Sequence, residues 1–168
     1  DPDTDRIMGA QVIGESGADK RIDVIATAMR ADLIASDLAD LELAYAPQFG
    51  SAKDPINFVG FVNDNIVAGE KSVQWHELDE RMAGGATLVD VRSAAEYAAG
   101  AIPGSVNIPL DDIRERKAEF ESMDDIIVHC QVGLRGHLAT TLLHNLGIEA
   151  SNLDGGYLTW TDGKASQQ

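Results

Sequence analysis

Cys130 and Arg135 are the residues of this sequence whose types and spacing are best suited to chemistry, and a short loop joins them. The β-branched run Ile126–Val128 precedes Cys130, and leucines recur at helical spacing from Leu138, so the segment predicts a strand, a tight loop and a helix. Between a strand and a helix, unpaired backbone N–H groups and the helix dipole favour negative charge. Cys130 is therefore expected to react as a thiolate, and Arg135 adds a fixed cation that suits a bound oxyanion.

The loop itself is expected to bind the substrate. Its N–H groups form a cradle that needs no reorganisation when negative charge arrives, and Gly133 lets the backbone curl. A sulfane sulfur, the outer sulfur of thiosulfate or of a persulfide, is an electrophile that a thiolate attacks, so Cys130 is predicted to carry a persulfide. With Cys130 and Arg135 as catalytic residues, the predicted substrate-binding residues are Gln131, Val132, Gly133, Leu134 and Gly136.

Composition restricts the partners and the compartment. The 168 residues suffice for one ordinary domain or two small ones, and the formal charge of −15 opposes binding to nucleic acid or to anionic lipid. No run approaches the roughly 18 apolar residues that a membrane helix needs, so a soluble protein is predicted. The single cysteine excludes an intramolecular disulfide, and the N-terminus does not resemble a signal peptide, so the cytoplasm is the predicted compartment.

No metal is expected. The histidines have neither a partner cysteine nor a ligand spacing typical of a metal site, and they are His76, His129, His137 and His144. His137 is predicted to lie on a helix surface rather than to act as a base. Asp90 and Arg92 follow a buried strand and are predicted to fasten loops at the rim of the sheet.

Residues 71–168 predict an α/β domain. Its expected strands are residues 73–75, 88–91, 106–108, 125–129 and 150–153. Ser93 and Glu96 predict a capping box, Asp111 a helix cap, and Tyr157–Trp160 a last helical turn. Strands that alternate with helices imply a parallel sheet covered on both faces, with ligands at the carboxyl ends of its strands, where Cys130 lies.

This half of the chain resembles the rhodanese family. The matching segments are residues 88–93 with Glu96 and Tyr97, residues 100–109, the loop after Cys130, and residues 153–156 with Trp160. In the family's order they cover almost all of residues 72–163, and the resemblance implies a rhodanese-like sheet and a sulfurtransferase. Ala101 stands where histidine is usual, and Gly136 where serine often follows the loop arginine, so Gly136 is expected to remove a hydroxyl near the thiol and weaken activity.

Two other functions stay open. A cysteine phosphatase also places cysteine and arginine on a loop around an oxyanion. The phosphatases that resemble this fold have five residues between the two, whereas four lie between Cys130 and Arg135. The remaining class is a non-catalytic regulatory or interaction module, which an intact Cys130 disfavours.

Residues 1–70 predict an incomplete α+β segment. A strand is expected at residues 7–13, and helices at residues 18–33, 36–43 and 55–68. Ser36 is the predicted cap of the second helix, and Asp54 followed by Pro55 begins the third. One strand and three helices make a poor independent fold, so this segment is expected to belong to a larger sheet whose earlier strands lie upstream.

Residues 40–57 resemble the C-terminal dimerisation domain of pyridine nucleotide-disulfide oxidoreductases, in the coenzyme A-disulfide reductase and NADH oxidase branch. Gln48 stands where that branch usually has proline. In the family the tyrosine of a Tyr-Ala-Pro motif approaches the partner subunit's active site, so that role would carry over to Tyr45. For this chain by itself, the favoured interpretation is that Tyr45 only packs or forms a hydrogen bond locally. The resemblance also suggests a homodimer through residues 1–70.

Together the two resemblances imply the tail of a coenzyme A-disulfide reductase fused to a rhodanese, of the NADH-dependent persulfide reductase type. This chain has no Gly-x-Gly-x-x-Gly fingerprint, so no cofactor is expected in it. FAD, NAD(P)H and CoA are expected only in a longer protein with upstream domains. The expected partners of this chain are a small sulfane-sulfur donor and a thiol acceptor.

Overall fold

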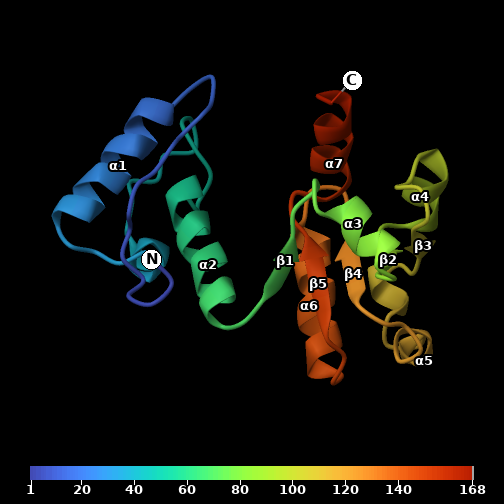
Figure 1. Ribbon diagram of the computed structural model, residues 1–168. Coiled ribbons are helices and arrows are strands. Elements are labelled where there is room, and N and C mark those ends of the chain that lie inside the picture. The colour runs from blue at the N-terminus through green and yellow to red at the C-terminus, as the bar shows by residue number, and fades with distance from the viewer. Residues whose placement is uncertain (168) are drawn as a thin grey trace. The chain divides into compact units, whose positions relative to one another are not determined.

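The computed structural model describes residues 1–167, which divide into two compact units, Asp1–Glu70 and a second unit that begins at Lys71 (Figure 1). Gln168, the last residue of the predicted second domain, lies outside the described residues. Each unit has its own buried apolar side chains, so each is described by itself.

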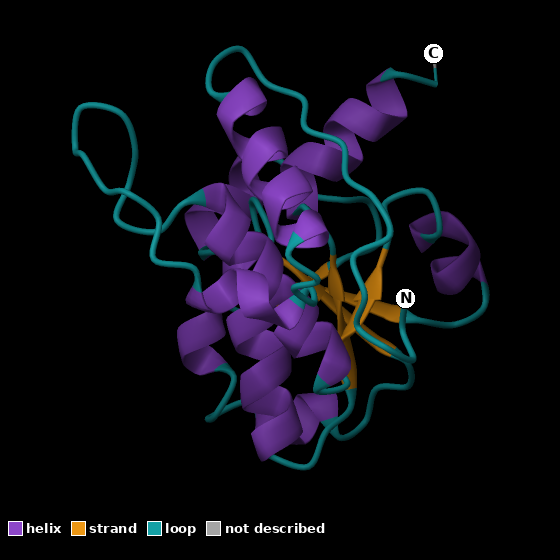
Figure 2. Ribbon diagram, turned by 90° about the vertical axis from the view of Figure 1, so that its left-hand side faces the viewer, coloured by secondary structure: helices purple, strands orange, loops and turns teal. Residues whose placement is uncertain are grey.

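A five-stranded parallel sheet forms the centre of the second unit (Figure 2). Its strands are β1 Lys71–Val73, β2 Thr87–Asp90, β3 Val106–Asn107, β4 Ile126–His129 and β5 Ala150–Leu153. The strand order is β1-β5-β4-β2-β3, and every pair is parallel. All four residues of the central strand β4 are buried, as expected for a strand covered on both faces. The predicted α/β fold with a parallel sheet is confirmed.

Helices pack on both faces of this sheet. They are α3 Leu78–Ala83, α4 Ala94–Ala99, η2 Leu110–Asp112, α5 Lys117–Phe120, α6 Leu134–Asn145 and α7 Gly156–Ala165. Side chains alternate across a strand, so Ile127 of β4 packs in one apolar cluster with Leu78 and Leu153. Its neighbour Val128 packs in a second cluster with Leu143 of α6. Full burial of each such side chain contributes about 1.5–3 kcal/mol, so the two clusters are the main stabilisation of this unit.

The first unit has three helical segments around a small apolar core. They are α1 Ala18–Arg30, η1 Ser36–Asp40 and α2 Pro55–Val67. Asp54 caps α2 as predicted, because its carboxylate accepts from the Ile56 N–H while the Asn57 side chain accepts from the Asp54 N–H.

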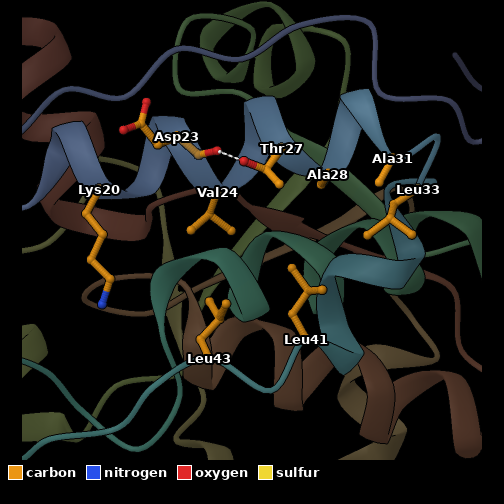
Figure 3. A pocket seen from close by; sticks show the side chains of 9 residues that line it. All are labelled: Lys20, Asp23, Val24, Thr27, Ala28, Ala31, Leu33, Leu41 and Leu43. Carbon is orange, nitrogen blue, oxygen red and sulfur yellow. Dashed lines mark hydrogen bonds between the residues drawn. The ribbon is translucent and has the colours of Figure 1, made fainter.

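An apolar cavity of about 440 Å³ lies beside α1 in this first unit (Figure 3). Its lining residues are Lys20, Asp23, Val24, Thr27, Ala28, Ala31, Leu33, Leu41 and Leu43. Val24, Leu41 and Leu43 point toward the space between α1 and the segment after η1 (Figure 3). The unit therefore does not by itself cover all of its apolar side chains.

The predicted strand at residues 7–13 is wrong. In this region the structure has one isolated antiparallel bridge, between Arg6 and Ile34. A strand needs a neighbour that pairs with its N–H and C=O groups, and beyond that bridge residues 1–167 supply no paired strand to this segment.

Two predicted helix caps are also wrong. Ser36 donates its N–H to the Asp5 carboxylate and accepts from the Asn63 side chain, so the short 3₁₀ helix η1 replaces the predicted helix at residues 36–43. Asp111 lies inside the 3₁₀ helix η2, which Pro109 precedes, and caps nothing. Bonding partners distant in sequence at Ser36, and a proline before Asp111, therefore decide the backbone more strongly than the capping preference of the residue type.

Three other elements differ from the prediction by more than one residue at an end. Helix α1 ends at Arg30 rather than Leu33, because Asp32 adopts a left-handed conformation with φ of 56°. β1 covers residues 71–73 instead of 73–75, because pairing with β5 places Val73 opposite Leu153. The last helix, α7, has ten residues rather than a single turn.

No helix among residues 1–167 has both the length and the apolar character needed to cross a membrane. The longest, α1 and α2, have 13 residues each, whereas a spanning helix needs about 20.

Candidate active site

Cys130 directly follows β4 and begins the loop that leads into α6. Its side chain is 1% exposed, and its Sγ accepts a hydrogen bond from the Gly133 N–H at 3.2 Å. Gly133 has a φ of 104°, a backbone conformation that residues with a Cβ rarely adopt. Glycine is therefore favoured at the position whose N–H points at the sulfur. Because α6 begins at Leu134, the positive end of its dipole lies at the loop and favours negative charge there.

The start of α7 holds the other side of this loop. The Tyr157 N–H donates to the Cys130 carbonyl at 2.8 Å, and the Leu158 N–H donates to the Gln131 carbonyl at 3.1 Å. A Cβ on Gly156 would lie 2.5 Å from the Cys130 carbonyl oxygen, so only glycine permits this approach. The loop backbone is therefore fixed by a helix that the sequence places more than 20 residues later.

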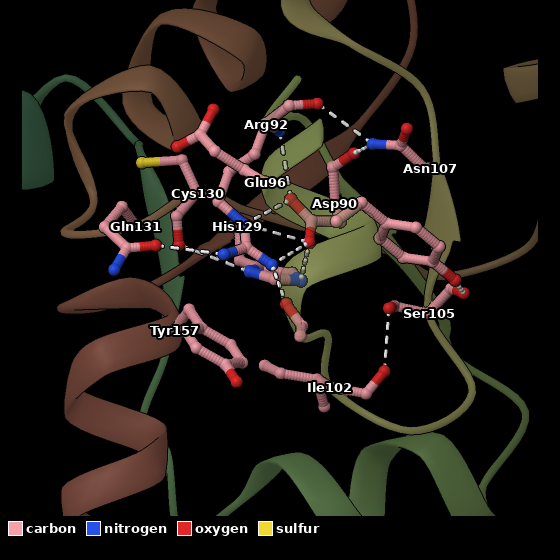
Figure 4. A network of polar contacts seen from close by, with 12 residues as sticks. Asp90, Arg92, Glu96, Ile102, Ser105, Asn107, His129, Cys130, Gln131 and Tyr157 are labelled. Atoms are coloured by element: carbon pink, nitrogen blue, oxygen red, sulfur yellow. Dashed lines mark hydrogen bonds and ion pairs between the residues drawn. The ribbon is translucent and has the colours of Figure 1, made fainter. Parts of the chain in front are cut away.

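Asp90 and Arg92 form a buried ion pair below the loop (Figure 4). Their side chains are 0% and 3% exposed, and the guanidinium donates from Nε and from a terminal nitrogen to the carboxylate at 2.7–3.0 Å. The bonds to Asp90 raise the pKa of Arg92 against the effect of its burial. The carboxylate therefore compensates the charge of a guanidinium that would be costly to bury alone.

Arg92 also reaches the loop. It donates to the Gln131 side-chain oxygen at 2.9 Å and to the Gly100 carbonyl at 2.7 Å, and it lies 4.4 Å from the centre of the Tyr157 ring. The sequence predicts that Asp90 and Arg92 fasten loops, but it does not link them to the cysteine loop. The only local signal is an arginine two residues after a buried aspartate at a strand end.

His129, the last residue of β4, is fully buried beside the cysteine. Its Nδ1 lies 3.3 Å from the Cys130 carbonyl oxygen, and its Nε2 lies 3.7 Å from an Asp90 carboxylate oxygen. Burial lowers the pKa of His129 from its ordinary value of 6.5, so the imidazole is neutral at pH 7. Unfolding exposes it, so it contributes stability above about pH 6.5 that fades as the pH falls.

Arg135 binds Glu96 of α4 rather than standing free for an anion. Its two terminal nitrogens donate to the two carboxylate oxygens at 2.8 and 2.7 Å. Glu96 also accepts from Ser93, in the capping box that the sequence predicts. Arg135 and Ser93 together hold the pKa of Glu96 far below its usual 4.5. The stability that this ion pair contributes is therefore fully present above about pH 4.5, and it is lost only as the pH falls toward the lowered pKa of Glu96.

The thiol itself also contacts Arg135. After the Glu96 hydrogen bonds, the charge and hydrogen bonding of Cys130 are further causes of the raised pKa of Arg135. The structure thus brings the two predicted catalytic residues together, with the Arg135 charge already partly neutralised by a carboxylate from another element.

Replacing Glu96 by glutamine should make the thiol region more attractive to anions. The variant keeps the shape and the helix cap but leaves the Arg135 charge unbalanced. Cys130 can be alkylated by the anion iodoacetate and by the neutral reagent iodoacetamide. The ratio of the first rate to the second should rise about threefold or more at low salt. The matched control is Glu119→Gln, which removes the carboxylate of another Arg–Glu pair, on α5. An equal rise in both variants would show that overall charge, rather than Arg135, sets the ratio.

The other predicted loop residues have different surroundings. Val132 and Leu134 are 60% and 66% exposed, and form an apolar rim beside the cysteine. Gln131 directs its side chain to Arg92, and Gly136 lies in the first turn of α6 against Asn152 of β5. Among the described residues there is no group of three or more metal-ligating side chains.

Tyr45 belongs to the first unit. Its side chain is 58% exposed, so most of the ring is not packed within that unit. It lines a cavity of about 600 Å³ together with Arg21, Phe49 and Asn57.

Comparison with known proteins agrees with this geometry. A family model described as a rhodanese-like domain matches residues 74–162, more than half of the 168 residues. The structure of reduced Bacillus anthracis CoADR-RHD is 49% identical, with a TM-score of 0.79 over 84% of this chain and 26% of that chain. The NAD-dependent persulfide reductase from A. fulgidus is 34% identical, with a TM-score of 0.73 over 88% of this chain and 26% of that chain.

A shorter relative matches the second unit. The human thiosulfate:glutathione sulfurtransferase is 37% identical over 112 residues, which are 57% of this chain and 97% of the human protein. By contrast, this chain spans only about a quarter of the two longer relatives, 26% of each. The predicted resemblance to the tail of a coenzyme A-disulfide reductase with a rhodanese domain is confirmed. The chain belongs to the family of rhodanese-like domains.

Proposed function

We propose that this chain transfers sulfane sulfur through a persulfide on Cys130, from thiosulfate or a small persulfide to a small thiol. The observation that carries the proposal is the Gly133 N–H, which donates to the Cys130 Sγ at 3.2 Å where α6 begins. A fixed donor at this point stabilises a negatively charged sulfur when it attacks and again when it leaves. Similarity to the human thiosulfate:glutathione sulfurtransferase along nearly its whole length supports this chemistry.

The transfer has two steps. The Cys130 thiolate attacks the outer sulfur of thiosulfate, a new S–S bond forms, the S–S bond within thiosulfate breaks, and sulfite leaves with the electron pair. The acceptor thiolate then attacks the outer sulfur of the Cys130 persulfide, and Cys130 leaves as a thiolate. Backbone N–H groups serve both steps because the loop is already held by α7 and by Arg92. A reducing compartment such as the cytoplasm would keep this single thiol free.

A cysteine phosphatase is the second candidate, and the loop disfavours it. Four residues separate Cys130 from Arg135, and Glu96 occupies both terminal nitrogens of that arginine. A phosphate dianion would have to displace the Glu96 carboxylate before Arg135 could bind two of its oxygens. The short loop and the paired arginine therefore disfavour a phosphate ester held at two oxygens by Arg135.

Two substrates distinguish these functions. After incubation with thiosulfate, the intact protein should gain the mass of one sulfur, and peptide mapping should locate that sulfur on Cys130. An aryl phosphate should be hydrolysed no faster by this chain than by its Cys130→Ser variant. Cys130-dependent release of phosphate without a mass gain from thiosulfate would replace sulfur transfer by the phosphatase function.

In a longer protein, we propose that this chain is the sulfur-handling end of a flavin-dependent coenzyme A-disulfide or persulfide reductase. The similarity to CoADR-RHD and to the persulfide reductase across both units supports this role. Residues 1–70 would then contribute to a homodimer, with Tyr45 directed to the partner subunit's active site. FAD, NAD(P)H and CoA would bind to domains outside this chain.

Removing such upstream domains should abolish oxidation of reduced nicotinamide and leave Cys130-dependent sulfur transfer intact. The reason is that the thiol, Gly133, Arg135, Glu96 and Arg92 all lie after Ser72, in the second unit. The measurement compares NADH oxidation and thiosulfate-dependent sulfur transfer in the longer protein and in this chain. Loss of both activities together would show that the second unit does not carry the transfer by itself.

A further inference from the structure

We propose that Asn152 is a positioning residue for the Cys130 loop, and that Gly136 is the residue that makes room for it. The inference adds to the proposed sulfur-transfer site and rests on that function only for its kinetic consequence. Asn152 lies on β5, directly opposite Val128 of β4, and therefore beside the strand that leads to Cys130. Parallel pairing places its side chain near the carboxyl end of that strand.

Asn152 contacts the loop at the carbonyl group of Gly133. Its side-chain nitrogen donates to the Gly133 carbonyl at 3.4 Å, and the His137 N–H donates to the same oxygen at 2.9 Å. Gly133 is the residue whose N–H reaches the Cys130 sulfur. With its carbonyl held from two sides, Gly133 has less freedom to rotate the N–H away from the thiol.

The Asn152 side chain is held in a space that a Cβ would fill. A Cβ on Gly136 would lie 2.1 Å from the Asn152 side-chain oxygen, and its three nearest atoms all belong to Asn152. A serine at position 136 would therefore press on the amide, which gives Gly136 a packing role in addition to the expected loss of a hydroxyl near the thiol. Residues 136 and 152 should be energetically coupled.

Burial of the Asn152 amide costs free energy, because only part of its hydrogen-bonding capacity is satisfied. Asn152 is 8% exposed, and its side-chain oxygen is buried with no hydrogen-bond partner among residues 1–167. The amide orientation is set by the Gly133 carbonyl, because the opposite orientation would bring two oxygens together. An apolar residue would avoid the unpaired oxygen but would lose the bond to the loop.

A double-mutant cycle tests the proposal with Cys130 alkylation by iodoacetamide, which requires no sulfur donor. Asn152→Ala should move the pH midpoint of alkylation upward, with a loss of about two- to tenfold in rate at pH 7 from the weakened hydrogen bond. Gly136→Ser should be more harmful by itself than in the Asn152→Ala background, where the space is empty. Ser151→Ala, the neighbour on the opposite face of β5, is the control and should match the parent chain.

Additive effects of the two substitutions would overturn the coupling, and an Asn152→Ala variant with the parent's alkylation profile would overturn the positioning role. Asn152→Asp separates shape from hydrogen bonding, because it keeps the size and the acceptor but lacks the donor. Asn152→Asp should change Cys130 alkylation as Asn152→Ala does, but it should not reduce the harmful effect of Gly136→Ser, because the space stays filled. If Asn152→Asp did reduce that effect, the proposal would also be overturned. Coupling in alkylation without any sulfur transfer by the parent chain would contradict the proposed function and leave this inference standing.

Discussion

Replacing Cys130 by serine should reduce thiosulfate-dependent sulfur transfer by at least about 1,000-fold, because the hydroxyl cannot form the persulfide that links the two half-reactions. The effect should be on turnover rather than on the apparent affinity for thiosulfate, since the loop N–H groups remain. Steady-state release of sulfite, measured with a thiol acceptor in excess, gives both quantities.

The serine variant should stay folded. The side chain is nearly isosteric, and a hydroxyl oxygen can accept from the Gly133 N–H and from Arg135 as the sulfur does. Thermal unfolding of the variant and of an exposed control, His144→Ala, should therefore follow that of the parent chain, with His144→Ala keeping full turnover. Substantial sulfite release by the Cys130→Ser variant would assign the transfer to another group.

Replacing Asp90 by alanine should reduce the free energy of unfolding by about 3–5 kcal/mol, because it leaves the Arg92 charge buried and unpaired. The Arg92 side chain is only 3% exposed. The loss should also disorder the loop, since Arg92 donates to Gln131. Urea unfolding measures the stability, and Cys130 alkylation measures the loop.

Two companion variants separate charge burial from other effects. The double variant Asp90→Ala with Arg92→Met removes both charges and should recover part of the lost stability, which keeps the test possible if the single variant does not fold. Glu149→Ala breaks an exposed ion pair with Lys71 and should leave the urea midpoint almost unchanged. A single Asp90→Ala variant as stable as the parent would show that the buried pair contributes nothing to the fold.

The two predictions depend on different levels of organisation. The proposed role of Cys130 depends on a local strand, loop and helix, so it can be inferred from residues that are neighbours in the chain. Asp90 acts through Arg92 on a loop 39 residues away from that arginine. Its effect follows from burial, which the sequence does not show.

Local signals were sufficient wherever the bonding partners are close in sequence. The run Ile126–Val128, Gly133 and the later leucines predict the strand, loop and helix around Cys130, and the structure has these elements. Asp54 and Ser93 cap their helices as predicted, because the partner groups lie two or three residues away. The alternation of strands and helices likewise predicts the parallel sheet.

Tertiary structure decided which groups surround the thiol and which predicted strand finds no neighbouring strand to pair with. Glu96 binds Arg135 across 39 residues, and Asn152 of β5 fills the space beside Gly136, contacts that only the strand order β5-β4-β2 brings together. The strand expected at residues 7–13 has suitable residues but does not form, because a strand is stabilised by a neighbour and not by its own sequence. By itself the sequence determined the order of strands and helices along the second unit and the candidate nucleophile, whereas packing decided which carboxylate pairs with Arg135 and what supports the loop, because both depend on burial and on partners far along the chain.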